Sequence, residues 1–246
     1  MEAVTVEAVT KRFGRITAVE GISFAIRRGE VLGLIGENGA GKTTTMRMMA
    51  AILQPTEGEI RINGYSVRQD AMAVRRQIGI LFGGDVGLYE RLTARENIAF
   101  FGRLYGLEPK RLAERIAFLA ELLGMEAFLD RRVGPFSRGM QQKVAIARTL
   151  VHDPDVILLD EPTTGLDVSA AAVFRQLITA LRQAGKTILF SSHNMGEIEK
   201  LCDRLAIMHK GRLLFVGTLA ELRHYAGLHD LDDLFVKMVS GGERLG

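Results

Sequence analysis

One stretch of the chain decides its fold: Val31-Leu32-Gly33-Leu34-Ile35-Gly36-Glu37-Asn38-Gly39-Ala40-Gly41-Lys42-Thr43-Thr44. Its first five residues are nearly all apolar, which is typical of a strand buried on both faces. The residues from Gly36 onward match the pattern G-x-x-x-x-G-K-[S/T], and the apolar, methionine-rich segment 42–53 is predicted to be a helix. A strand, a glycine-rich turn and a helix in this order predict a loop whose backbone N–H groups surround a phosphate chain.

The residues of this loop are expected to divide the work of binding a nucleotide. Its glycines allow close approach of the backbone to the phosphates, and the positive end of the helix dipole adds to the attraction. Lys42 is expected to reach the terminal phosphates, and the hydroxyl of Thr43 to bind Mg²⁺. The alternative is a glycine-rich turn without a ligand. The predicted nucleotide-binding residues of the loop are Gly36, Asn38, Gly39, Ala40, Gly41, Lys42, Thr43 and Thr44.

Composition is that of an ordinary globular protein, since 47% of the 246 residues are apolar and 25% are charged. The formal net charge is only +3, which excludes nucleic-acid binding through bulk positive charge. The single cysteine, Cys202, excludes an intramolecular disulfide and a cysteine-based metal site, and we expect it to be a buried small hydrophobe. The longest apolar run, 48–53, is far shorter than the ~20 residues that cross a bilayer, and no signal peptide is visible.

The patterns of apolar residues divide the chain into two kinds of region. Alternation over 4–9 and 22–26 predicts half-buried antiparallel strands. From about residue 86 to 150 the pattern is helical, and Thr93-Ala94-Arg95-Glu96 is a capping box that begins one of the helices. Beyond this region, predicted strands and helices alternate, which indicates a parallel sheet with crossover helices. We therefore expect one α/β core that is interrupted by an all-helical insertion.

Two acidic residues follow the buried strand predicted over 156–159. In an open α/β sheet, ligands bind at the carboxyl ends of the strands, so both acids should lie near the phosphate loop. Asp160 is expected to hold Mg²⁺, directly or through water. Glu161 is expected to orient or deprotonate an attacking water. The alternative is that two acids merely occupy a turn, and their pairing with the loop at 36–44 favours the functional interpretation.

The order of these motifs resembles that of the nucleotide-binding subunit of ATP-binding-cassette (ABC) transporters. The family's signature, LSGGQ, is matched by Phe136-Ser137-Arg138-Gly139-Met140, which departs from it at three positions. Thr164-Gly165-Leu166-Asp167 is similar to the family's D-loop, and Ser191-Ser192-His193 to the segment that carries its switch histidine. Phe13 stands where the family stacks an aromatic ring on adenine. The resemblance covers about residues 4–218.

The resemblance implies that two copies of the chain enclose ATP and Mg²⁺ between them. Ser137 begins a predicted helix, so its hydroxyl and the N–H groups after it form an anion site, which in the family closes on the ATP of a second subunit. The alternative is that Ser137 serves only as a helix N-cap. The implied functional residues are the catalytic Glu161 and His193, the Mg²⁺ ligands Thr43 and Asp160, and the nucleotide-contacting Phe13, Ser137, Arg138, Gly139, Met140 and Asp167.

His193 is the histidine to which we assign a function. A histidine after a strand more often serves packing, but the strand predicted over 187–191 should end beside Asp160, within reach of Glu161 or of a γ-phosphate. The other histidines show no metal-ligand spacing, and we expect them at the surface: His152, His209, His224 and His229.

The resemblance also implies the architecture. The expected fold is α/β: a P-loop NTPase (RecA-like) core with an N-terminal antiparallel β subdomain and an inserted α-helical subdomain. No repeat, linker or low-complexity segment divides the sequence, so we expect a single domain over 1–246. The core and β subdomain should occupy 1–85 and 151–218, the helical subdomain 86–150, and a C-terminal helical extension 219–246.

One departure from the family concerns a glutamine that usually follows the strand predicted at 78–81. Here the position is held by Gly83 or Gly84, depending on where a one-residue insertion is placed. Either Asp85 substitutes for the glutamine with a charged oxygen, or the loop acts through its backbone. The sequence leaves both alternatives open.

These observations predict an ATP-hydrolysing subunit that drives the separate transmembrane permease subunits of an exporter. We expect it in the cytoplasm, held at the inner face of the cell membrane by the permease, with the 83–89 loop and the helical insertion as the docking surface. The segments 88–93 and 101–106 look most like ATPase subunits of the sodium-exporting NatA type. A drug or a lipid is the alternative cargo.

Two other classes of protein share part of this pattern. A soluble ABC ATPase that acts on nucleic acid or ribosomes is the first alternative, but such proteins usually carry coiled-coil arms, zinc modules or a second cassette, and this sequence shows none of them. A P-loop enzyme of small-molecule metabolism, such as a kinase, is the second, and it would have no use for a signature at 137–140 that faces a partner. We therefore expect no nucleic-acid partner.

Overall fold

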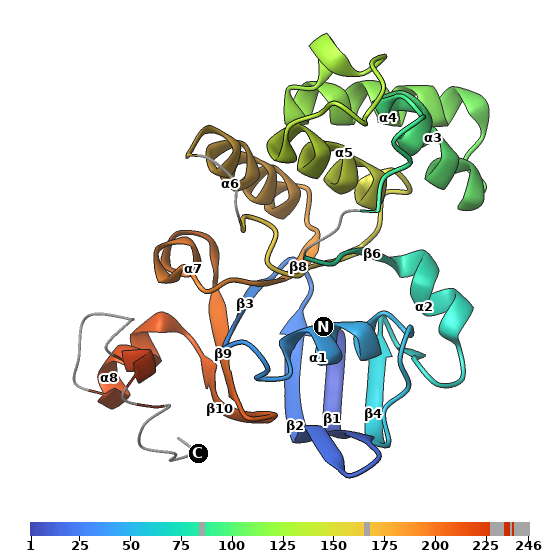
Figure 1. Cartoon of the computed structure of the whole chain (residues 1–246). Coiled ribbons are helices and arrows are strands. Elements are labelled where there is room, and N and C mark those ends of the chain that lie inside the picture. Colours follow the sequence, from blue (N-terminus) through green and yellow to red (C-terminus); the bar gives the residue numbers. More distant parts are fainter. Residues whose placement is uncertain (84–86, 165–167, 227–233, 237, 239–246) are drawn as a thin grey trace.

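A computed structural model describes residues 1–83, 87–164, 168–226, 234–236 and 238 of the chain (Figure 1). A six-stranded sheet with the order β10-β9-β3-β8-β7-β6 forms its centre. All of its strands run parallel except β10, which pairs antiparallel with β9 at one edge. The strands are β3 (Val31–Ile35), β6 (Ile78–Leu81), β7 (Val156–Leu159), β8 (Thr187–Ser191), β9 (Arg204–His209) and β10 (Arg212–Gly217).

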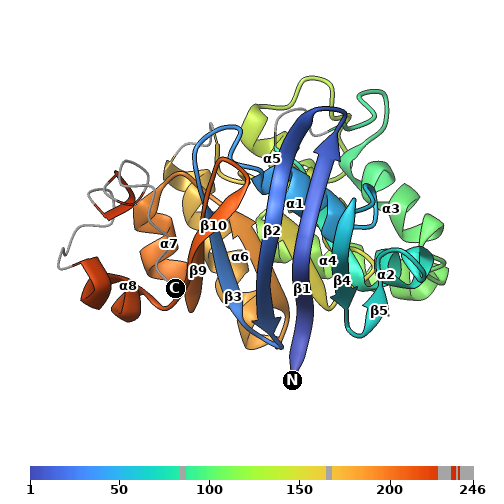
Figure 2. The ribbon, with the colours of Figure 1, turned by 90° about the horizontal axis from the view of Figure 1, so that it is seen from below.

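A four-stranded antiparallel sheet, with the order β2-β1-β4-β5, packs beside the central sheet (Figure 2). Both strands of its long hairpin extend well beyond the alternating segments that predicted them, because pairing continues through irregular register to the turn. The strands are β1 (Glu2–Phe13), β2 (Ile16–Arg27), β4 (Glu57–Ile62) and β5 (Tyr65–Ser66).

Strand β3 shows why the central sheet is buried on both faces. Val31 and Ile35 point into one hydrophobic cluster, which includes side chains of the helices on that face. Leu32 and Leu34 point into the other, which the small sheet and helix α1 (Lys42–Met49) complete. Because successive side chains of a strand alternate between faces, five buried residues in a row join both halves of the core.

The insertion is helical, as the sequence predicted. Its first helix begins with the predicted capping box, in which Thr93 and Glu96 satisfy each other's backbone N–H groups. Its second helix ends at Gly124, whose left-handed backbone closes the last turn. The helices are α3 (Ala94–Leu104), α4 (Pro109–Leu123), a short 3₁₀ turn (Glu126–Phe128) and α5 (Arg138–Leu150).

The remaining helices complete the two faces of the sheet. Helix α2 (Ala71–Gln77) was not predicted, and helix α1 ends four residues before the predicted 42–53 segment does. Helices α6 (Val168–Gln183) and α7 (Met195–Leu201) lie on the same face of the sheet as the insertion, and α8 (Leu219–Ala226) begins the C-terminal part. None of the helices in the described part of the chain has both the length and the apolar character needed to span a bilayer.

Two of the four histidines expected at the surface are largely covered by neighbouring residues, so the prediction for them was wrong. His152 is covered by the ring of Tyr105, which stacks on it at 3.6 Å between centroids. His209 lies at the end of β9, where its side chain is only 13% exposed. His224 is exposed as predicted, and His229 lies outside the described residues.

Candidate active site

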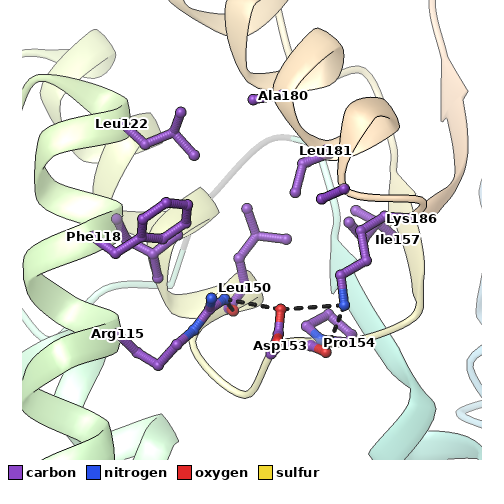
Figure 3. A pocket seen from close by; sticks show the side chains of 12 residues that line it. Arg115, Phe118, Leu122, Leu150, Asp153, Pro154, Ile157, Ala180, Leu181 and Lys186 are labelled. Atoms are coloured by element: carbon purple, nitrogen blue, oxygen red, sulfur yellow. Dashed lines mark hydrogen bonds and ion pairs between the residues drawn. The ribbon is translucent and has the colours of Figure 1, made fainter.

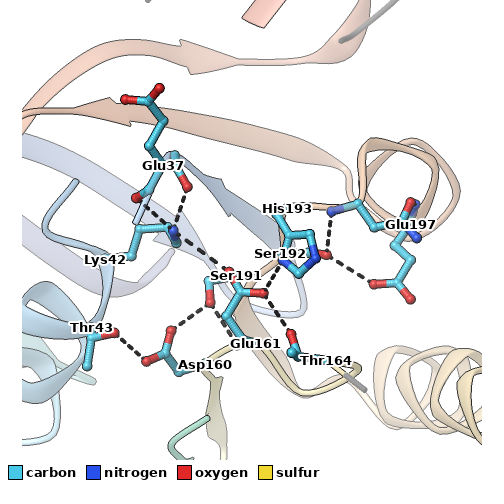
Figure 4. A network of polar contacts seen from close by, with 12 residues as sticks. Glu37, Lys42, Thr43, Asp160, Glu161, Thr164, Ser191, Ser192, His193 and Glu197 are labelled. Carbon is cyan, nitrogen blue, oxygen red and sulfur yellow. Dashed lines mark hydrogen bonds and ion pairs between the residues drawn. The ribbon is translucent and has the colours of Figure 1, made fainter. Parts of the chain in front are cut away.

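The predicted phosphate loop and the predicted acids meet at one edge of the central sheet. Strands β3, β7 and β8 are parallel neighbours or next neighbours, so their carboxyl ends lie together. A hollow of about 280 Å³ opens there (Figure 4 shows the polar side chains around it). It is lined by Ala18, Glu37, Asn38, Gly39, Ala40, Gly41, Lys42, Thr43, Thr44, Asp160 and Glu161.

Two glycines allow the loop to lie close to the strands around it. A Cβ atom on Gly36 would lie 2.5 Å from the carbonyl oxygen of Met208 in β9. Gly41 has φ of +103°, and a Cβ there would lie 2.8 Å from the carbonyl oxygen of Ala18 in β2. A side chain at either position would push the loop away from strands of both sheets.

Lys42 begins helix α1 and is almost fully buried beneath the loop. Its Nζ donates to the carbonyl oxygens of Gly36, at 2.5 Å, and Glu37, at 3.2 Å. It also lies 3.8 Å from a carboxylate oxygen of Glu161. Carbonyl groups of the loop itself therefore hold the ammonium group at the hollow. Its positive charge is available there to an anion bound by the loop.

Asp160, directly after β7, is hydrogen-bonded on both carboxylate oxygens. The hydroxyl of Thr43 donates to Oδ2 at 2.5 Å, and the hydroxyl of Ser191 donates to Oδ1 at 2.7 Å. A hydroxyl and a carboxylate in contact beside a phosphate-binding loop are the oxygen donors that Mg²⁺ takes when phosphates supply its other ligands. This donor set fits the ion that the sequence predicted.

Glu161 points away from Asp160, toward the end of strand β8. One of its carboxylate oxygens, Oε2, lies 2.7 Å from Nδ1 of His193 and accepts a hydrogen bond of 3.1 Å from the hydroxyl of Thr164. Its backbone has φ of +49°, a left-handed conformation that residues other than glycine seldom adopt. The sequence prediction that His193 comes within reach of Glu161 is confirmed.

The structure keeps two predicted groups of site residues apart from this hollow. Phe13 lies near the tip of the β1–β2 hairpin with 48% of its surface exposed, and Lys11 places its ammonium group 5.0 Å from the ring centroid. Ser137 caps α5 by accepting a hydrogen bond from the N–H of Met140 at 3.3 Å. No residue of the 137–140 segment lines the hollow in the described part of the chain, and Asp167 lies outside that part.

Gly83, one of the two glycines that could hold the position of the family's glutamine, lies directly against the two acids. A Cβ atom there would lie 2.9 Å from the carbonyl oxygen of Asp160 and 3.3 Å from Cβ of Glu161. A glutamine at Gly83 would therefore need this segment to move. The other candidates, Gly84 and Asp85, lie outside the described residues.

We expect the variant Gly83→Ala to lower the rate of hydrolysis by about 10- to 100-fold, because displacement of catalytic groups by about 1 Å has an effect of this size. The matched control is Gly134→Ala, whose added methyl group would meet only Glu90, no closer than 3.4 Å. Both variants should be compared by steady-state ATP hydrolysis. Equal rates in the two variants would contradict the close packing of Gly83 on the acids.

A second cavity, of about 300 Å³, lies between helix α4 of the insertion and helix α6 (Figure 3). Its walls are mostly apolar, and at its mouth Arg115 and Lys186 both form ion pairs with Asp153 at 3.2 Å. Lys186 also pairs with Asp155 at 3.6 Å, so two carboxylates balance the two cations, and none of the predicted catalytic groups lines the cavity. The chemistry is therefore expected in the smaller hollow at the phosphate loop.

Two residues near the acids were missed as contributors by the sequence reasoning. Ser191 was noted only as part of the segment that is similar to the family's switch-histidine segment. It is fully buried and hydrogen-bonded to both Asp160 and Glu161. Glu197, at the start of α7, is 5% exposed and accepts hydrogen bonds from the hydroxyls of Thr163 and Ser192. The sequence signal for Glu197 is its place three residues after Asn194, a residue type that often caps helices and that caps α7 in the structure.

Comparison with known proteins places this geometry in a family. A sequence model described as ABC transporter matches residues 19–164, which include the phosphate loop, the signature and both acids. The ABC transporter ATP-binding protein NatA of Bacillus subtilis is 48% identical over 227 residues, which are 92% of each chain. The linearmycin resistance ATP-binding protein LnrL of the same organism is 35% identical over 88% of this chain and 69% of its own.

A solved structure supports the fold. The dimeric, post-hydrolysis ATP-binding cassette bound to ADP and Pi superimposes with a TM-score of 0.80. It is 27% identical, and the match covers 88% of this chain and 98% of that one. The predicted P-loop NTPase fold with its antiparallel and helical parts is therefore confirmed. The chain belongs to the ABC transporter family, as one of its ATP-binding ATPase subunits.

Proposed function

We propose that this subunit hydrolyses Mg-ATP at the edge of the central sheet and drives separate transmembrane subunits of an exporter. One observation carries the proposal: Lys42, the adjacent acids Asp160 and Glu161, and His193 meet at the phosphate loop although they come from three distant parts of the sequence. A binding module without hydrolysis would need the lysine and the metal ligands but not the pair of Glu161 and His193.

In the proposed reaction, each of these residues has one task. Lys42 neutralises charge on the terminal phosphates, which it approaches from beneath the loop. Thr43 and Asp160 would hold Mg²⁺, which supplies positive charge beside the phosphates when it is bound. Glu161 accepts a proton from the attacking water, and His193 holds the Glu161 carboxylate in the direction of that water through the contact at 2.7 Å.

The variant Lys42→Ala tests the first of these tasks. We expect ATP binding to weaken by about 10- to 100-fold, since a hydrogen bond to a charged group contributes about 1.5–3 kcal/mol. Titration calorimetry with Mg-ATP measures the change. Lys186→Ala is the matched control, because Lys186 is also mostly buried and ion-paired but lines the other cavity. Equal affinity in both variants would mean that Lys42 does not contact the nucleotide.

We propose further that two copies of the chain enclose two ATP molecules. The Ser137–Met140 segment at the start of α5 would contact the phosphates held by the partner copy, and Arg138 would add a cation there. Phe13 would stack on adenine, and Asp167 would lie in the contact between the copies. The distance of the signature from its own hollow supports this arrangement, as does the dimeric state of the cassette bound to ADP and Pi.

The surface for the transmembrane partner is proposed next to the 83–89 loop. Tyr89 is 48% exposed, and its ring meets Phe100 edge to face with 5.3 Å between centroids. Phe100 lies in helix α3, and two residues at the end of that helix, Leu104 and Tyr105, are also exposed. Exposed aromatic and apolar groups are typical of protein–protein interfaces. Because these groups lie beside the 83–89 loop, which begins next to the two acids, a partner bound here could respond to the nucleotide. Such a partner would hold the subunit at the inner face of the membrane.

The cargo we propose is Na⁺, on the strength of the resemblance of the 88–93 and 101–106 segments to NatA-type subunits. A drug is the second candidate, which the similarity to a linearmycin resistance protein favours. Transport of each compound by membrane vesicles that hold this subunit with its permease distinguishes the two.

A further inference from the structure

The side chain of Ser191 connects the two acids of the site (Figure 4). Ser191 is the last residue of β8 and is fully buried. Its hydroxyl donates to Oδ1 of Asp160 at 2.7 Å and accepts the backbone N–H of Glu161 at 2.8 Å. One buried hydroxyl therefore binds the side chain of the first acid and the backbone of the second.

The bond to Glu161 matters because of the backbone conformation there. With φ of +49°, Glu161 holds a conformation that costs roughly 1–3 kcal/mol for residues other than glycine and persists only where neighbours enforce it. This conformation turns the Glu161 side chain away from Asp160 and toward Lys42 and His193. The N–H of Glu161 has its partner in Ser191, so the hydroxyl stabilises the turn at the point where the two acids diverge.

We infer that Ser191 is a positioning residue that sets the directions of both acids, so that one faces the metal and the other the water. The inference rests on the proposed function, in which Asp160 holds Mg²⁺ and Glu161 accepts the proton. A hydroxyl suits this place because it donates one hydrogen bond and accepts another. Alanine does neither, so it would remove a donor from Asp160 and the acceptor from the N–H of Glu161.

The variant Ser191→Ala tests the inference. We expect kcat for ATP hydrolysis to fall by about 10- to 100-fold, the size of effect that misplaced catalytic groups produce. More Mg²⁺ should be needed for half-maximal rate, because Asp160 loses a donor that orients it. ATP binding without Mg²⁺ should stay within about twofold of the parent, because Ser191 does not touch Lys42 or the loop.

The matched control is Ser66→Ala. Ser66 is equally buried, and its hydroxyl donates to Glu59 and accepts from the backbone N–H of Arg68, far from the site in strand β5. The variant should lose stability but keep kcat and the Mg²⁺ requirement. A loss of kcat in Ser191→Ala no larger than in Ser66→Ala would overturn the inference.

The double variant Ser191→Ala with Glu161→Gln separates this inference from the proposed function. If Ser191 acts through Glu161, the double variant should be slower than Glu161→Gln alone by much less than the factor for Ser191→Ala. If the two factors multiply fully and the Mg²⁺ requirement of Ser191→Ala is unchanged, Ser191 positions neither acid, while Glu161 remains the base. Full activity of Glu161→Gln alone would instead contradict the proposed function itself.

Discussion

The variant Glu161→Gln should hydrolyse ATP about 10²- to 10⁴-fold more slowly than the parent, because a general base contributes about that much to the rate. Glutamine keeps the shape of the side chain and can still bond to Thr164, but it takes no proton from water. ATP affinity should be retained, since Lys42 and the loop are unchanged. Phosphate release and calorimetry measure the two quantities separately.

The control for this variant is Glu30→Gln, which also changes a buried, hydrogen-bonded acid. Glu30 precedes β3 at the opposite end of the sheet and pairs with Arg204 at 3.1 Å. Its variant should lose stability and keep kcat. An equal loss of kcat in both variants would show that Glu161 has no special role.

The same variant also tests the proposed pairing of two copies. Since Glu161→Gln should bind ATP without consuming it, saturating Mg-ATP should hold the protein as a dimer in sedimentation velocity experiments. The parent should return to monomer as its ATP is spent. A slow variant that stays monomeric would leave Glu161 as the base and would exclude the sandwich of two subunits.

The parts of the structure that sequence predicted are those with local signals. Helix α3 begins directly after the predicted capping box, in which Thr93 and Glu96 satisfy each other's backbone N–H groups. The site followed from a topological rule: residues after parallel strands meet at one edge, and so Asp160 and His193 were placed beside the phosphate loop. Neither prediction required knowledge of side-chain packing.

The parts that were missed depend on contacts between residues far apart in sequence. Helix α2 is a local exception: it has only seven residues and no side-chain cap, because the carboxylate of Asp70 accepts a hydrogen bond from the nearby N–H of Ser66 instead. The role of Ser191 depends on the register of β8 against β7, which pairs residues about 30 positions apart. The burial of His152 depends on where the end of α3 packs.

His152 joins the helical insertion to the central sheet. Its ring stacks on Tyr105 at the end of α3, and its Nε2 lies 3.0 Å from the carbonyl oxygen of Ile78 at the start of β6. Burial lowers the pKa of His152 from 6.5 to about 4, and the nearby cations Arg115 and Lys186 act in the same direction. The hydrogen bond to Ile78 opposes the shift without cancelling it. The folded protein therefore holds this imidazole neutral.

A neutral buried histidine makes the stability of the fold fall in acid. Below pH 6.5 the unfolded chain binds a proton at His152, whereas the folded chain binds it only when the pH approaches about 4. The contribution of neutral His152 to the free energy of unfolding is complete above the pKa of the unfolded chain. About 3 kcal/mol of it is lost as the pH falls to the pKa of the folded chain.

Urea unfolding between these two pH values should show a smaller loss of stability for His152→Gln than for the parent. His224→Gln, at an exposed histidine, should follow the parent. Parallel curves for His152→Gln and the parent would mean that protonation of His152 does not oppose folding, and that the stacked pair tolerates a charge between the insertion and the sheet.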